Sequence, residues 1–130
     1  MKKKIETDKA PRALGTYSQA IESNNTVYLS GQIPIDPKTS KIVKGDENQI
    51  RQVFRNIKAV SEGCESSLDQ IVKLTVYLID LNIFPVLNEI MKEFFEEPFP
   101  ARAVVQVARL PLDSQIEIEG IIVKEDTYNY

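Results

Sequence analysis

The residues best placed to do chemistry include an arginine near the C-terminal end of the chain. Arg102 follows Pro100 and Ala101 at the expected opening of a strand, and the ends of sheets are common ligand sites. A guanidinium is a planar fork that binds a carboxylate through two parallel hydrogen bonds, each worth about 1.5–3 kcal/mol. Arg102 is therefore a candidate clamp for a carboxylate. A surface arginine that caps a strand end is the simpler alternative.

A pair of glutamates follows on the next expected strand. Glu117 and Glu119 alternate with isoleucines, so both project from the face that also carries Ile121 and Val123. A carboxylate beside an apolar surface can act as a general base on water, an effect on the order of 10²–10⁴-fold. Two carboxylates this close repel each other, so we expect one to enter a site and the other to meet a cation. A solvated strand edge is the alternative interpretation.

Two short segments rich in glycine and hydroxyl groups are candidates for orienting a polar ligand. They read Gly-Thr-Tyr-Ser-Gln-Ala at residues 15–20 and Leu-Ser-Gly-Gln at residues 29–32. A turn and a strand end explain the same residues without any function. Their spacing matches neither a Walker loop nor a dinucleotide fingerprint. Cys64 has no neighbour in the sequence that would make it a thiolate, so we interpret it as a small buried residue.

The composition excludes several classes of function. The chain has no histidine, which removes the commonest general base, the Ser-His and Cys-His nucleophile systems and most zinc sites. A net charge of -3 without a basic block argues against nucleic acid as a partner. No apolar stretch has the length of a membrane span, so no membrane association is expected. The one cysteine and the lack of a secretory signal predict a cytoplasmic location.

Hydrophobic periodicity predicts an α+β fold in a single domain, residues 1–130. The 130 residues, 42% of them hydrophobic, are enough to bury one core. Strands are expected at residues 26–32, 71–79, 101–109 and 115–124, another near 4–7 or 17–21, an irregular hairpin or loop at 33–44, and helices at 46–63 and from Asn82 to before Pro98. Two helices cover only one face of a sheet, yet the last two strands look apolar on both faces. An apolar face left in water predicts self-association.

Together, and in their order along the chain, these segments resemble the RidA (YjgF-type) family of reactive-intermediate deaminases. The matching segments are Ala10-Pro11, Gly15, Tyr17–Ala20, Ser30–Pro34, Gln49, Asn56–Ala59, Val72-Lys73, Asn88-Glu89, Phe99–Arg102, Val107–Pro111 and Glu117–Glu119. The resemblance implies a chorismate-mutase-like fold, with a mixed sheet, two helices on one face, and a homotrimer with clefts between subunits. It also implies a 2-iminobutanoate/2-iminopropanoate deaminase, which hydrolyses enamine and imine acids to 2-keto acids and ammonia without a cofactor or a metal.

The resemblance assigns roles to individual residues as well. It implies that Arg102 holds the carboxylate of an imino or enamino acid and that Glu117 activates or positions the attacking water. The implied lining of the cleft consists of Tyr17, Ser30, Asn88 and the backbone groups of Gly31 and Val104.

Three positions depart from the family pattern. Thr16 stands where a proline usually precedes the tyrosine, and Val104 stands where many members carry a cysteine. Ser40 replaces a glycine, which would cost roughly 1–2 kcal/mol if that position needs a positive φ. Three other functions stay open on the sequence alone. They are a non-catalytic sensor of small carboxylates such as 2-keto acids, a translation inhibitor or ribonuclease, and a chaperone-like protein.

Overall fold

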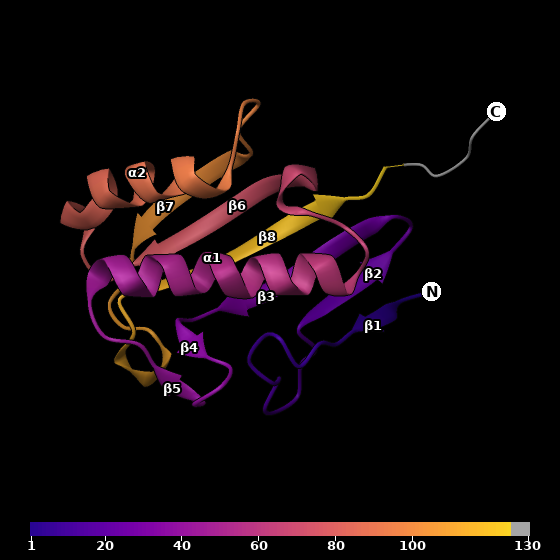
Figure 1. The fold of residues 1–130 in the computed structure, drawn as a ribbon, viewed down its shortest axis with the longest axis horizontal. Helices are drawn as coiled ribbons and strands as arrows, with labels where there is room; N and C mark the ends of the chain where they lie inside the picture. Colours follow the sequence, from indigo (N-terminus) through magenta and orange to yellow (C-terminus); the bar gives the residue numbers. More distant parts are fainter. Residues whose placement is uncertain (126–130) are drawn as a thin grey trace.

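The chain folds into one six-stranded mixed sheet with both of its described α-helices packed against the same face (Figure 1). The computed structural model describes residues 1–125. The strands run in the order β1-β2-β3-β8-β6-β7, and a separate hairpin is formed by β4 and β5. The elements are β1 (Lys3–Ile5), β2 (Ala20–Ser23), β3 (Thr26–Gln32), β4 (Ile35–Asp36), β5 (Lys41–Ile42), α1 (Asp46–Gly63), β6 (Ile71–Leu78), α2 (Phe84–Phe94), β7 (Ala101–Gln106) and β8 (Ile116–Val123).

The core lies between the sheet and the two helices. The apolar stripe of α1 is buried over its whole length, as its helical spacing predicts. Phe54 joins the two helices there, because its ring lies 5.3 Å from the ring of Phe94 and 5.6 Å from that of Phe95. On the sheet side, Leu74, Val76 and Leu78 are completely buried. The free thiol of Cys64 is buried as predicted, and burial raises its pKa.

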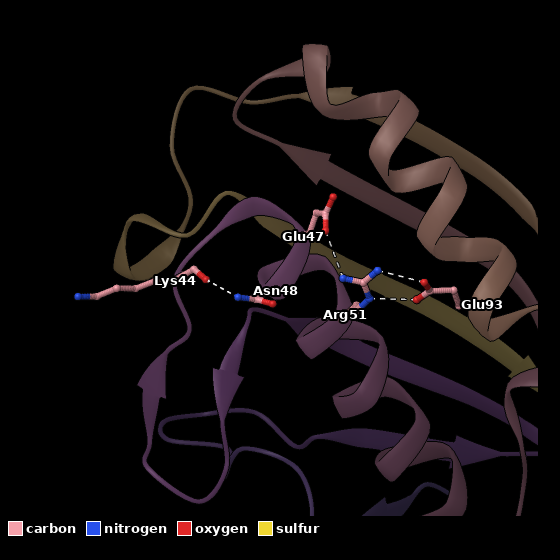
Figure 2. Close-up of polar contacts among 5 residues, drawn as sticks. All are labelled: Lys44, Glu47, Asn48, Arg51 and Glu93. Carbon is pink, nitrogen blue, oxygen red and sulfur yellow. Dashed lines mark hydrogen bonds and ion pairs between the residues drawn. The ribbon is translucent and has the colours of Figure 1, made fainter.

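An ion pair on the surface also links the helices (Figure 2). The Nε and Nη2 atoms of Arg51 in α1 each donate to one carboxylate oxygen of Glu93 in α2, both at 3.0 Å. Glu47, one turn earlier in α1, accepts a longer bond of 3.4 Å from the same guanidinium. The hydrogen bonds to Arg51 lower the pKa of Glu93. This contact ties α2 to α1.

The register of the sheet places the candidate residues. Strands β6 and β7 run parallel, and a parallel pair needs a long crossover, which here contains α2. Strand β8 pairs antiparallel with both β3 and β6. Side chains alternate between the two faces, so Lys73, Thr75 and Tyr77 point away from the helices.

The face opposite the helices, here called the open face, carries large apolar side chains. Tyr28, Val105 and Val123 are 52%, 43% and 46% exposed, and Ile121 is half-buried beside them. The sequence predicted such a second apolar face. Glu117, Glu119, Lys73 and Thr75 interrupt it, so the open face is mixed in character. An apolar surface of this kind is typical of an interaction site.

The sequence located most elements, but three predicted details differ. Both proposed N-terminal regions contain strand residues, β1 and β2, which pair with each other. The predicted strand at 101–109 already ends at Gln106. The predicted start of the second helix at Asn82 is wrong by two residues. The backbone N–H of Asn82 donates to the Asp80 carboxylate at 2.9 Å, a 3₁₀ turn follows at Leu81–Ile83, and α2 begins at Phe84.

Candidate active site

Arg102 is held by three residues of α2. It is the second residue of β7 and pairs in register with Leu74, so its side chain leaves the sheet on the helix face. Its Nη1 donates to the Asn88 Oδ1 at 2.7 Å and contacts the Met91 sulfur at 3.2 Å. The guanidinium also lies 5.0 Å from the centre of the Phe84 ring. The orientation of the fork is therefore set before any ligand arrives.

One edge of this guanidinium remains available. A guanidinium carries five N–H donors, of which the Nη1 donors are directed at Asn88 and Met91. Nε and Nη2 of Arg102 form one side of the fork. No residue among the described 125 accepts a hydrogen bond from either of them. Beside this fork is a pocket of about 570 Å³. The pocket is lined by Asn88, Glu89, Met91, Lys92, Phe99, Pro100 and Arg102. A small carboxylate fits this arrangement.

Glu117 lies on the open face and packs against Gly31 of β3. A Cβ atom added at Gly31 would lie 2.1 Å from the Glu117 Oε2, so only glycine permits this approach. Burial raises the pKa of Glu117, and the negative charge of Glu119 raises it further. A carboxyl of this kind holds its proton more tightly than an ordinary glutamate and can act in proton transfer.

Glu119 has a different partner from the one predicted. We expected a cation, but its carboxylate accepts a hydrogen bond from the Tyr77 hydroxyl on β6. That hydrogen bond raises the pKa of Tyr77, and burial adds to the effect. Sequence reasoning missed Tyr77 because alternation assigns it to the open face without saying which β8 residue lies opposite.

The loop that contains Tyr17 is bonded to β3 at Ser30, the residue before Gly31. The Ser30 hydroxyl donates to the Ser18 carbonyl at 2.6 Å, and the Ser30 N–H donates to the Gln19 carbonyl at 3.0 Å. Gln19, which the sequence did not single out, is buried. Its side chain bonds the backbone of Thr7 and Pro11 at 2.8–2.9 Å. Tyr17 is 53% exposed beside this braced loop.

The predicted site residues thus form two groups. Arg102 and Asn88 belong to the first, together with Val104, whose side chain packs against the core. Val107 donates its N–H to Leu78 on β6, so strand alternation directs the backbone of Val104 to the outer edge of β7. Gly31 and Glu117 form the second group on the other side of β6, with Ser30 next to Gly31 in β3, and the loop that contains Tyr17 is bonded to Ser30 through Ser18.

Comparison with known proteins identifies the family. Residues 7–124 match the family described as Endoribonuclease L-PSP. A RutC family protein from Pyrococcus horikoshii is 53% identical over 96% of this chain and 100% of its own. A protein from Dermatophagoides farinae named 2-iminobutanoate/2-iminopropanoate deaminase is 45% identical over 95% of this chain and 98% of its own. The chain belongs to the RidA family.

Solved structures of RidA proteins share the fold. RidA from an Antarctic Psychrobacter species superposes with a TM-score of 0.92 at 51% identity, covering 94% of this chain and 99% of that one. TdcF from Escherichia coli, crystallised with bound serine, gives a TM-score of 0.90 at 43% identity, covering 95% and 99%. The predicted α+β RidA fold is therefore confirmed. Among residues 1–125, no helix has the length and hydropathy needed to cross a membrane, and no cluster of three potential metal ligands occurs.

Proposed function

We propose that this RidA protein is a 2-iminobutanoate/2-iminopropanoate deaminase, which converts enamine and imine acids to 2-keto acids and ammonia. The observation that carries the proposal is the Arg102 fork, which Asn88 and Met91 orient in the lining of a pocket and whose Nε and Nη2 donors have no partner among the described residues. These two donors suit the carboxylate shared by all such substrates. The name of the Dermatophagoides farinae relative supports the same chemistry.

We propose that the working unit is a homotrimer with clefts between subunits. Arg102 and Glu117 lie on opposite faces of the sheet, so one small substrate cannot touch both in a single chain. The apolar open face supplies a surface for association. In this assembly the β7 edge of one subunit, with Arg102 and the Val104 backbone, faces Glu117, Gly31, Ser30 and Tyr17 of its neighbour. A cytoplasmic location accords with the free thiol of Cys64.

The reaction then needs only positioning and proton transfer. An iminium acid already carries an electrophilic carbon, and the carboxylate on Arg102 fixes that carbon in the cleft. Glu117 takes a proton from water while the oxygen forms a bond to the imine carbon, which gives a carbinolamine. The proton then passes to nitrogen, the C–N bond breaks as the carbinolamine hydroxyl gives its proton to Glu117, and the keto acid and ammonia leave. One water is consumed for each ammonia released, and neither a metal nor an oxidant takes part.

A binding role without turnover is the second candidate. The crystal structure of TdcF with bound serine shows a small amino acid held by a relative. A sensor of small carboxylates would use the same Arg102 fork. It would bind the ligand without releasing ammonia.

The test generates 2-aminoacrylate in place with a serine or threonine dehydratase and follows formation of the keto acid. We expect faster release with the wild-type protein and no acceleration with Arg102→Ala. Arg109→Ala is the matched control, because Arg109 is exposed and pairs only with Asp113 among the described residues. No acceleration by correctly assembled wild type, with several amino-acid precursors, would refute the deaminase and favour the sensor.

A further inference from the structure

On the open face, the side chain of Tyr77 on β6 reaches diagonally toward two glutamates of β8, Glu117 and Glu119. In the β6–β8 register Tyr77 is the direct partner of Glu117, and Thr75 is the direct partner of Glu119. The Tyr77 hydroxyl nevertheless bonds Glu119, not the residue opposite it. The Tyr77 side chain therefore extends from a backbone position opposite Glu117 to the carboxylate of Glu119, its diagonal neighbour.

We propose that Tyr77 and Glu119 are positioning residues for Glu117, with Tyr77 anchoring the Glu119 carboxylate so that its charge stays beside the catalytic carboxyl. This inference rests on the proposed function, because it assigns the pair a task only if Glu117 transfers the proton. It goes beyond that function by naming Tyr77 and Glu119 as the residues that set the negative charge beside Glu117.

Within its own subunit, Glu119 supplies the charge that raises the pKa of Glu117 beyond the effect of burial, and in the proposed trimer Arg102 of the partner subunit faces Glu117 as well. On β8 and the two strands paired with it, the titratable side chains that share the open face with Glu117 are Glu119, Tyr77, Lys73 and Tyr28. The neighbouring positions on β7, Ala101, Ala103 and Val105, carry no charge. Lys73 forms no ion pair with either glutamate within residues 1–125, so it does not cancel the charge of Glu119 directly.

The anchor explains why the charge of Glu119 persists close to Glu117. Tyr77 donates its proton to Glu119, and this bond raises the pKa of Tyr77, so the hydroxyl stays protonated and continues to donate. A fixed negative charge on the same face makes loss of the proton from Glu117 harder. Glu117 then remains a proton donor at higher pH than an ordinary glutamate. An acid that must return its proton to nitrogen benefits from this.

Two substitutions separate the charge from its anchor. Glu119→Gln removes the charge, so Glu117 should ionise at lower pH and the acid limb of kcat/KM should move to lower pH. Tyr77→Phe leaves the charge but frees the carboxylate to swing toward water, which gives a shift in the same direction but smaller. In the Glu119→Gln background, Tyr77→Phe should add no further shift. Matched controls are Glu62→Gln on the exposed side of α1 and Tyr28→Phe on the open face.

The decisive measurement is a ¹³C NMR titration of the Glu117 carboxyl, assigned with Glu117→Gln, run beside the pH profile of activity. The inference predicts a lower titration midpoint in Glu119→Gln and unchanged midpoints in both controls. An active Glu119→Gln protein whose Glu117 titrates as in wild type overturns the inference and leaves the deaminase intact. Wild type that titrates as predicted but releases no ammonia refutes the deaminase instead, because the titration needs no substrate.

Discussion

Arg102 and Glu117 lie on opposite faces of the same sheet, with strand β6 between them. Arg102 is paired with Leu74 and contacts α2, whereas Glu117 is paired with Tyr77 on the open face. Two strand spacings alone separate their backbones by about 10 Å. In the proposed reaction one small substrate contacts both groups, which is the reason for proposing that a second copy of the chain completes the site.

This geometry predicts that two inactive variants restore each other. Arg102→Ala and Glu117→Gln proteins are unfolded together and refolded as mixed trimers. Every mixed trimer contains one interface that combines an intact Arg102 with an intact Glu117 of the neighbour. Random mixing should therefore give about a quarter of wild-type activity.

A mixture that stays inactive would contradict a site shared between subunits. If both residues served one subunit, no mixture of the two variants would exceed the activity of either alone. Refolding each variant by itself is the control, and size-exclusion chromatography with light scattering verifies the assembly.

The contact between Asn88 and Arg102 predicts a loss of substrate affinity on mutation. Asn88→Ala removes the bond that orients Nη1, and a hydrogen bond to a charged group is worth about 1.5–3 kcal/mol. We expect KM to rise roughly 10-fold or more, with a smaller change in kcat. Asn48→Ala is the control, because the Asn48 amide donates to the Lys44 carbonyl rather than holding Arg102 (Figure 2). An unchanged KM would show that Asn88 does not orient the clamp.

The close approach of Gly31 to Glu117 predicts a specific clash. In Gly31→Ala the new methyl group would meet the Glu117 Oε2 at 2.1 Å, so the carboxyl must move away. We expect kcat to fall about 100-fold while circular dichroism shows a folded protein. In a Glu117→Gln background, already inactive, the activity cannot fall much further, and the two effects should be strongly non-additive. Additive losses of activity would show that Gly31→Ala does not act through the Glu117 carboxyl.

The raised pKa of Glu117 predicts that this residue weakens the fold at neutral pH. The native state holds the proton more tightly than the unfolded state, so the free energy of unfolding falls as pH rises through the window between the ordinary glutamate pKa and the raised one. Above that pH window, the stability contributed by the bound proton is completely lost. Glu117→Gln should remove this dependence and raise the Tm at neutral pH while abolishing activity. Thermal melts across pH 4–8, compared with Glu62→Gln, measure it.

The backbone conformation at Ser40, remote from the site, predicts that a glycine at this position stabilises the fold. Its φ of 61° lies in the left-handed region, as the departure from the family's glycine suggested. Ser40→Gly removes a strain of roughly 1–2 kcal/mol and loses part of it to the greater freedom of glycine in the unfolded chain. We expect a net gain of about 0.5–1 kcal/mol in urea unfolding. Ser40→Ala, which keeps the strain, should give no gain.

The sequence by itself determined the elements that carry the site. Apolar residues at helical spacing located α1, and alternation located β3, β6 and β8, because these patterns follow from the geometry of one helix or strand. Alternation also put Glu117 and Glu119 on one face of β8. Residue types alone indicated Arg102 as a carboxylate clamp, since few side chains offer a planar fork of donors.

Only the tertiary structure decided which of these residues meet. The pairing of Tyr77 with Glu119, the contact of Gly31 with Glu117 and the support of Arg102 by α2 all join segments far apart in the chain. Strand register sets such contacts, and a shift of one residue would move every side chain to the other face. The separation of Arg102 from Glu117 has the same origin. It follows from the order of strands in the sheet, which local periodicity does not encode.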